Sequence, residues 1–294
     1  MITRRTLFTM CMLAMLISIP CLCSLWADEK TPDTKGKEIK SGVDWENGFI
    51  YSIGFGLPPI NETNEKAMKR MAQEAAYLDA LRNLAKIIDG IAINSETVVK
   101  DSIIASDRIR TRISGFIKGA VVDTVYFRKD HSAEVILKIP LNGDGSLSDI
   151  LFPSKPKIID NWEEILPPPS PKPDTSDSAA LIRSGIVIDA HGLKISQSMI
   201  PKIYTDKGDI LYSAESIDMR LLKGNGLVDW ASDVQSAMER DRVAGSPVVI
   251  KAREPKKGNK IPTDLVVSLD ELKNLIDDKS LEFLLKNGKV VLVY

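Results

Sequence analysis

A proline-rich segment in the middle of the chain limits what it can fold into more than any other feature. Seven prolines stand within residues 151–180, and five of them lie within residues 167–173. Such a run is extended and stiff and makes no internal hydrogen bonds, so it acts as a spacer and does not enter a core. The segments on either side are each long enough for one ordinary domain. The sequence therefore predicts one domain at residues 44–150, a proline-rich linker at residues 151–180 and a second domain at residues 181–294.

The N-terminus carries an apolar segment of the kind found in export signals. Two arginines precede an apolar run over residues 7–26, and a small residue precedes Asp28. This order predicts a cleaved signal peptide over residues 1–27, followed by a flexible polar spacer over residues 28–43. An uncleaved membrane anchor, a lipoprotein signal and a twin-arginine signal are the alternatives. We therefore expect a periplasmic protein that contacts a membrane only through an uncleaved N-terminus, if at all.

The composition provides few cysteine and histidine side chains that could act as a nucleophile or bind a metal. All three cysteines, Cys11, Cys21 and Cys23, lie inside the predicted signal, and the chain has two histidines, His131 and His191. Removal of the signal would remove every thiol, which excludes a disulfide and a thiolate nucleophile. A protein zinc site needs three or four ligands, so we expect no metal and no cofactor. The formal net charge of −1 argues against a nucleic-acid partner, which requires a basic surface.

The first domain begins with a predicted strand and a long helix. Residues 49–56 are β-prone and end at two prolines, and residues 64–90 combine helical spacing with many alanines. Asn64 or Thr63 is expected to cap this helix. A partial Gly-x-Gly pattern at the end of the strand lacks the third glycine of a dinucleotide site. The apolar residues expected to pack on the sheet share one helical face: Met71, Ala75, Leu78, Leu81, Ala85 and Ile88.

Residues 103–117 permit two interpretations. Their apolar spacing favours a second helix, whereas alternation of apolar residues with Arg108, Arg110 and Arg112 favours a strand. On a strand, the three arginines would form a basic row, either as a solvated face or as a docking row for an acidic partner.

Two further strands are predicted to pair in the first domain. Residues 119–127 and 133–139 are rich in β-branched residues, and the short connection between them contains His131. His131 has no second ligand nearby in the sequence, so we expect no metal role for it.

The second domain is also predicted to mix helices and strands. Residues 202–212 suggest a hairpin, residues 227–240 carry helical spacing, and Ser268 with Glu271 fits a capping box that opens a helix. Further strands are predicted at residues 185–190, 247–252, 264–267 and 289–294. The fold class predicted for the whole chain is α+β: two small domains, each with a mostly antiparallel or mixed sheet and packed helices.

Two passages resemble known families. The first consists of Ala72-x-x-Ala75-Ala76-x-x-Asp79-Ala80-x-Arg82-Asn83-Leu84-Ala85, Ile88-x-Gly90 and Ile117-Lys118-Gly119-Ala120. Over residues 43–142 the chain resembles the domain shared by a small membrane-associated lipoprotein family and the N-terminal region of flagellar assembly protein T. From residue 185 onward it is similar to the C-terminal region of uncharacterised exported relatives. The resemblance implies an envelope location, a place at the base of a flagellum with basal-body proteins as partners, and no chemistry.

Asp189 and His191 are the residues with the best case for catalysis. They stand two apart at the end of a predicted strand, where sites often form. A hydrolase would also need a nucleophile within reach, and Ser196 and Ser198 lie in no strand–turn–helix elbow. We therefore expect Asp189 and His191 to hold a turn at Gly192.

The function predicted from the sequence is structural. We expect an exported, non-catalytic envelope protein that acts in structure or assembly through protein–protein contacts, with Arg108, Arg110, Arg112, Asp189 and His191 as candidate surface residues. The alternatives are a periplasmic hydrolase that uses Asp189 and His191, and a module that binds cell-wall glycan. Outside the predicted signal and linker, Trp45 and Trp230 are the only tryptophans, so support for glycan binding is thin.

Overall fold

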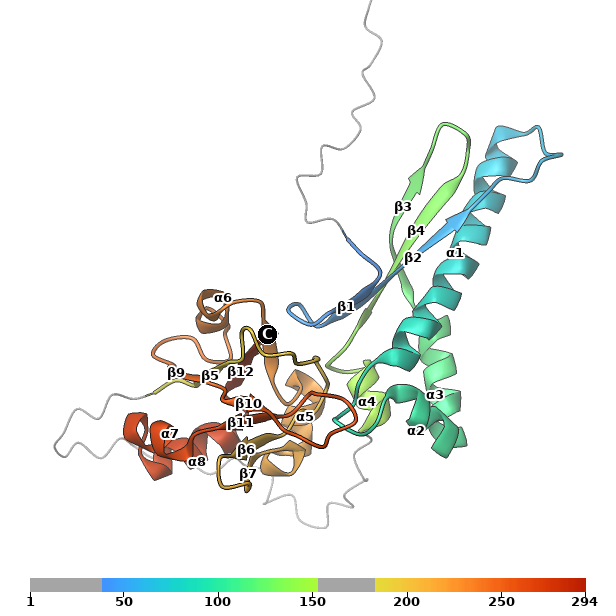
Figure 1. The fold of residues 1–294 in the computed structure, drawn as a ribbon. Helices are drawn as coiled ribbons and strands as arrows, with labels where there is room; N and C mark the ends of the chain where they lie inside the picture. Colours follow the sequence, from blue (N-terminus) through green and yellow to red (C-terminus); the bar gives the residue numbers. More distant parts are fainter. Residues whose placement is uncertain (1–38, 153–182) are drawn as a thin grey trace, which may run out of the picture. The chain divides into compact units, whose positions relative to one another are not determined.

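A computed structural model describes residues 39–152 and 183–294 of the chain (Figure 1). The predicted signal peptide, most of the spacer and nearly all of the proline-rich linker lie outside the described residues. The described residues form an N-terminal region with one four-stranded sheet and a C-terminal region with two. The predicted α+β fold with two regions is confirmed.

The N-terminal region is an antiparallel sheet with a long helix along one face. The strand order is β1-β2-β4-β3, and α1 packs on the two central strands, β2 and β4 (Figure 1). The predicted strand pair with its short turn is confirmed as β3 and β4. The elements of this region are β1 (Gly42–Asp44), β2 (Phe49–Gly56), α1 (Glu65–Gly90), α2 (Val99–Ala105), α3 (Asp107–Lys118), β3 (Val121–Phe127), β4 (Ala133–Pro140) and α4 (Leu147–Leu151).

The contact between α1 and β2 is made by small residues. A side-chain carbon added at Gly54 would lie 2.2 Å from the Ala76 carbonyl oxygen, and one at Gly56 would lie 2.0 Å from that of Ala72. The two glycines therefore let the helix backbone approach the strand, which explains the Gly-x-Gly pattern without a nucleotide. The residues of α1 that are buried recur at every fourth position: Ala72, Ala76, Ala80, Leu84 and Ile88.

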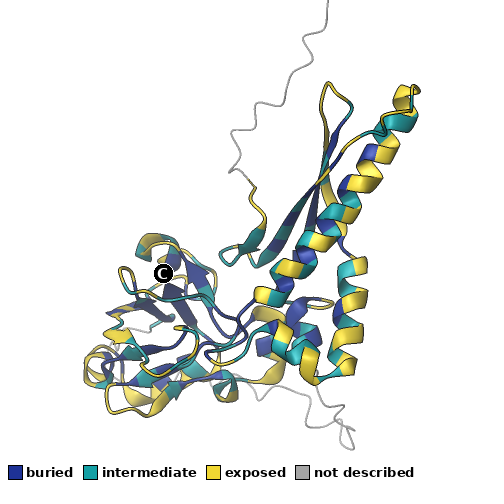
Figure 2. Cartoon of the chain, turned by 45° about the vertical axis from the view of Figure 1, so that its right-hand side comes forward, coloured by how far each residue is buried: buried dark blue, intermediate teal, exposed yellow. Residues whose placement is uncertain are grey.

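The helix face predicted to pack on the sheet was wrong in most of its positions. Met71 is 44% exposed and Leu78 is 47% exposed, and Figure 2 shows α1 with one buried and one exposed face. Both faces carry apolar residues, so periodicity alone did not separate them. Only the face with small alanine side chains lets the helix backbone come close to the glycines of β2. This steric match decides which face of the helix is buried.

The arginine-bearing segment forms helices, so the alternative of a strand with a basic row is wrong. Ser106 caps α3 through its side chain, which accepts a hydrogen bond from the Ile109 backbone N–H. Helical geometry places residues 108 and 112 near one face of α3 and residue 110 on the opposite side, so the three arginines do not form one row.

The C-terminal region contains a parallel sheet and a mixed sheet. The parallel sheet has the order β8-β12-β5-β9, and the mixed sheet has the order β10-β11-β6-β7. The elements are β5 (Ile186–Asp189), β6 (Ile203–Thr205), β7 (Ile210–Tyr212), the short 3₁₀ helix η2 (Ala214–Ser216), α5 (Met219–Asn225), β8 (Asp229–Ala231), α6 (Val234–Met238), β9 (Val248–Lys251), β10 (Glu254–Pro255), β11 (Leu265–Val267), α7 (Leu269–Leu275), α8 (Asp278–Lys286) and β12 (Val290–Val293).

Most local predictions for this region hold, with two differences. The hairpin is confirmed as β6 and β7, and Ser268 is confirmed as the cap of α7. The helix predicted over residues 227–240 was wrong, because its first residues form the buried strand β8 and only Val234–Met238 is helical. The sequence predicted mostly antiparallel or mixed sheets, so the fully parallel sheet was not predicted. Its strand β12 is buried at every position, as expected for a parallel strand covered on both faces.

Within residues 39–152 and 183–294, no helix has the length and apolarity needed to cross a bilayer.

Candidate functional site

Backbone hydrogen bonds join the N-terminal and C-terminal regions. The Met199 N–H donates to the Ala92 carbonyl at 3.0 Å, and the Ile200 N–H donates to the Ile93 carbonyl at 2.8 Å. These bonds fix Ser198, the preceding residue, at the junction of the two regions.

The turn between β1 and β2 reaches from the N-terminal region to the C-terminal region. The Asp44 carboxylate holds this turn by accepting hydrogen bonds from the backbone and side-chain nitrogens of Asn47, at 3.1 and 2.7 Å. The turn presents Glu46, whose Oε1 accepts a hydrogen bond from the Ser232 N–H at 2.9 Å and whose carbonyl accepts one from Arg240. A short turn of the first sheet is thus anchored on the loop that follows β8.

Two tryptophans that are far apart in the sequence meet at this junction. The rings of Trp45 and Trp230 are 6.4 Å apart between centroids, in an edge-to-face arrangement. Trp230 is buried, and its indole N–H donates to the Ser198 carbonyl at 3.1 Å. The pair therefore lies beside the junction segment, with each ring supplied by a different region.

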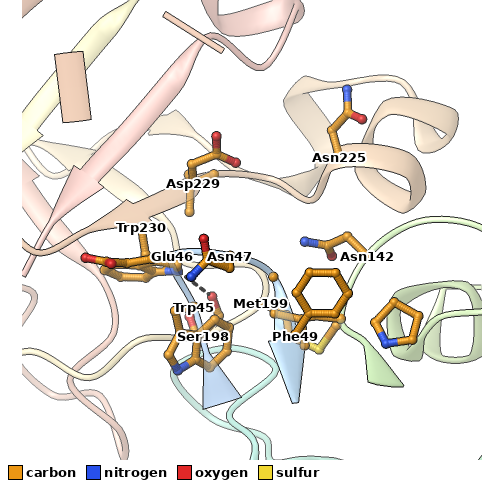
Figure 3. A pocket seen from close by; sticks show the side chains of 14 residues that line it. Trp45, Glu46, Asn47, Phe49, Asn142, Ser198, Met199, Asn225, Asp229 and Trp230 are labelled. Atoms are coloured by element: carbon orange, nitrogen blue, oxygen red, sulfur yellow. Dashed lines mark hydrogen bonds between the residues drawn. The ribbon is translucent and has the colours of Figure 1, made fainter. Parts of the chain in front are cut away.

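A cavity of about 310 Å³ opens at this junction (Figure 3). Figure 3 shows Asp229 and Asn225 on one side of the view and Trp45 and Phe49 on the other. Aromatic rings, side-chain amides and two carboxylates dominate the lining, and no lysine, arginine or histidine takes part. The lining residues are Trp45, Glu46, Asn47, Gly48, Phe49, Pro140, Leu141, Asn142, Ser198, Met199, Asn225, Val228, Asp229 and Trp230. We call this the junction pocket.

The Asp229 carboxylate at the junction pocket is already neutralised. Its Oδ1 lies 2.8 Å from Nη2 of Arg242, whose side chain is 10% exposed. The same guanidinium also donates to the carbonyls of Leu227 and Gly288, at 3.2 and 2.8 Å. Arg242 therefore stabilises the loops behind the pocket, and Asp229 offers hydrogen-bond acceptors without a full uncompensated charge.

Ser198 is the anomalous polar residue of the junction pocket. It is 1% exposed, and its Oγ has no hydrogen-bond partner among the described residues. A buried hydroxyl without a partner costs about 1–3 kcal/mol, so such groups in native proteins generally meet a water or a ligand.

A second junction contact joins α4 to α5. The Asp149 carboxylate pairs with the Lys223 ammonium, and its Oδ2 lies 4.0 Å from Nη2 of Arg112. The hydrogen bond from Lys223 is the main cause that holds the pKa of Asp149 below its ordinary value of 3.8. This ion pair fixes the two regions at a place separate from the pocket lining.

The structure does not bring the sequence-predicted site residues together. Arg112 donates to the carbonyls of Ile150 and Asp149 at 3.0 and 3.1 Å, so it holds α4 in place, and Arg110 pairs with Asp107 at 2.9 Å. Arg108 is exposed on α3.

Asp189 and His191 lie at the end of β5, in the turn expected for them. Oδ1 of Asp189 accepts a hydrogen bond from the His191 backbone N–H at 2.9 Å, and Gly192 follows with a φ of +84°. The His191 residue is exposed, and neither residue lines the junction pocket. The carboxylate thus holds a turn, as the sequence indicated.

Little in the sequence predicted the junction pocket. Its lining comes from five separated segments, and no short motif links them. The one available signal was the pair of tryptophans, and their proximity follows only from the contact between the two regions. Within the described residues, no group of three or more His, Cys, Asp or Glu side chains is placed to hold a metal ion.

No curated protein matches the chain. Residues 185–294 match the model of a protein family described as Treponema pallidum Tp0624, second domain. The match covers the C-terminal region, which is less than half of the chain, and it bears out only in part the predicted similarity of residues from 185 onward to the C-terminal region of uncharacterised exported relatives.

Proposed function

We propose that the protein is an exported, periplasmic component of the cell envelope that works without catalysis, by binding other proteins. Support for export comes from the signal-like sequence over residues 1–27. Support for an envelope role comes from the resemblance of residues 43–142 to the membrane-associated lipoproteins and to flagellar assembly protein T. That resemblance makes the flagellar base the first place to look for a partner.

The observation that carries the proposal is the β3 edge of the first sheet, on whose outer side no strand of residues 39–152 or 183–294 pairs. The strand β3 is last in the order β1-β2-β4-β3 and is exposed over most of its length. Val121 is 67% exposed and Phe127 is 44% exposed, with Val122 and Tyr126 also exposed. An uncovered, apolar edge of this kind is a template for a further strand.

The backbone of β3 has donors and acceptors available for such a strand. The Arg128 N–H donates to the Ser132 carbonyl, toward β4. Antiparallel strands alternate between residues that bond to the neighbour and residues that face away, so the amides of Val125 and Phe127 point to the open side. A β-bulge between Val122 and Thr124 limits the regular edge to the second half of the strand.

The charges at the ends of β3 indicate the chemistry of the partner. Lys118 precedes the strand and Lys129 follows it, and both are exposed. The fitting partner is an extended protein segment with β-branched or aromatic residues in its middle and acidic residues at its ends, because these complement both the apolar edge and the flanking ammonium groups.

A pair of substitutions at one position tests this proposal. Phe127→Pro removes the outward backbone donor, which an edge strand tolerates, whereas Phe127→Ala removes only the side chain. Phe283→Ala, at a residue 63% exposed on α8, is the control. The full chain, tagged after Tyr294, would be exported, cross-linked in envelope fractions and compared by quantitative mass spectrometry.

We expect the wild type and Phe283→Ala to capture the same protein, Phe127→Ala to capture less of it and Phe127→Pro to lose it. Equal capture by Phe127→Pro and the wild type would contradict strand addition. Recovery of the chain from the cytosol, or an enzymatic activity that Asp189→Ala or His191→Ala abolishes, would contradict the proposed function as a whole.

A further inference from the structure

We propose that the junction pocket binds a neutral saccharide. This inference goes beyond the proposed protein contacts, since it concerns a different surface, and it rests on the aromatic rings, amides and carboxylates that line the pocket. A cavity of about 310 Å³ lies at the lower end of the range for small-molecule sites.

The charges around the pocket exclude the other ligand classes. No lysine, arginine or histidine lines it, so a phosphate or carboxylate ligand would find carboxylates and no counter-charge. The carboxylate of Asp229 is paired with Arg242, so a cationic ligand would not gain a free anion there. An entirely apolar ligand would bury Asp229 and the side-chain amides without hydrogen bonds to the ligand, which is unfavourable.

A saccharide satisfies each of these groups. Its hydroxyls donate to carboxylates and to amide oxygens and accept from amide N–H groups, and its C–H faces pack on aromatic rings. The pocket presents Trp45 and Phe49 as rings, and Asn142 and Asn225 as amides from opposite regions.

The site is built by the contact between regions. Asn142 packs against Gly226, where an added side-chain carbon would lie 2.8 Å from its Nδ2. Asn225 precedes this glycine at the end of α5, while Trp45 and Phe49 flank the turn held by Asp44. Each region supplies rings and amides to the pocket, with Trp45, Phe49 and Asn142 from the first region and Trp230 and Asn225 from the second. The complete lining therefore requires both regions.

Titration of the exported chain with uncharged sugars tests the inference. The probes are glucose, N-acetylglucosamine and their β-1,4-linked dimers, read by tryptophan fluorescence and calorimetry, with choline and glucose 6-phosphate as charged comparisons. We expect saturable binding of at least one neutral sugar with a dissociation constant on the order of 1 mM, and none of the charged probes. Absence of binding of every neutral sugar up to about 10 mM, or tighter binding of choline, would overturn the proposal.

Substitution of Asn225 tests the amide contact of the pocket. Asn225→Ala should weaken sugar binding by about 3- to 10-fold, while Asn61→Ala on an exposed loop should leave it unchanged. The thermal unfolding midpoint of the sugar-free chain, measured for both variants, shows whether each one is folded. Unchanged sugar affinity in a folded Asn225→Ala chain would contradict the assignment.

Sedimentation with purified cell-wall sacculi identifies the source of the saccharide. Co-sedimentation that a soluble sugar reverses would assign the site to wall glycan, whereas binding of soluble sugar alone would assign it to a free saccharide. Failure here is distinguishable from failure of the proposed function, because Phe127→Pro should retain sugar binding and Asn225→Ala should retain capture of the protein partner.

Discussion

At Gly54 and Gly56, the absence of a side chain decides how closely α1 approaches the sheet. Carbonyl oxygens of the helix occupy the space that a side-chain carbon would need at either glycine. A hydrogen bond from the same strand also holds the helix close, since Ser52 Oγ donates to the Ala80 carbonyl at 2.7 Å. Local sequence signals cannot reveal this constraint, because the glycines and their partners are about twenty residues apart.

We expect Gly54→Ala to lower the free energy of unfolding by about 3 kcal/mol, because the added methyl group overlaps backbone atoms that cannot move independently. Gly115→Ala is the matched control: the added carbon meets nothing within 4 Å inside α3, and alanine favours the helix by about 0.5–1 kcal/mol. Urea denaturation of both variants measures the two changes. Similar unfolding midpoints would show that the close contact does not stabilise the fold.

A second residue-scale prediction concerns acid pH. The Lys223 ammonium lowers the pKa of Asp149 in the folded chain, so the ionised carboxylate stabilises the fold. That contribution is complete above the ordinary value of 3.8 and is lost as the pH falls through the lowered value. We expect Asp149→Asn to lower stability at neutral pH and to reduce the loss of stability between neutral and strongly acidic pH.

Urea unfolding at a series of pH values measures this difference, with Asp144→Asn, an exposed turn residue, as the control. A wild-type acid dependence that Asp149→Asn leaves unchanged would show that the ion pair between α4 and α5 does not stabilise the junction.

At the scale of elements, the strands, hairpins and caps predicted from short-range sequence patterns were mostly correct. The strand at residues 49–56, the hairpin of β6 and β7 and the cap of α7 all follow from turn chemistry, side-chain capping or alternation. The helix predicted over residues 227–240 was wrong because a run beginning Leu227-Val228 fits both a helix and a buried strand, and only its place beside β12 decides between them.

The start of α1 gives an element-scale prediction, since the sequence allowed either Asn64 or Thr63 as its cap. The structure selects Asn64, whose side-chain oxygen accepts hydrogen bonds from the backbone N–H groups of Lys66 and Ala67, at 3.0 and 3.3 Å. We expect Asn64→Ala to lower the free energy of unfolding by about 1 kcal/mol and Thr63→Ala to change it by less than about 0.5 kcal/mol. Chemical denaturation measures both, and the reverse order would assign the cap to Thr63.

At the scale of the whole molecule, the last strand holds the C-terminal region together. β12 lies between β5 and β8 in the parallel sheet and is buried throughout. We expect deletion of residues 290–294 to abolish cooperative unfolding of the C-terminal region, because both neighbouring strands lose their backbone partners and the core loses four apolar side chains.

Circular dichroism and limited proteolysis measure this loss. Deletion of Tyr294 alone keeps the whole strand and is expected to leave a folded, protease-resistant chain. A folded C-terminal region without residues 290–294 would show that the sheet closes through other contacts.

The sequence by itself determined the division into two α+β regions, most of the strands, the cap of α7 and the turn at Asp189 and His191, because these depend on neighbours within a few positions of the chain. Tertiary structure alone decided which face of α1 is buried, the parallel order of β8, β12, β5 and β9, and the meeting of Trp45 with Trp230 beside Ser198. These features depend on the fit of surfaces that are tens to hundreds of residues apart, and no local pattern records that fit.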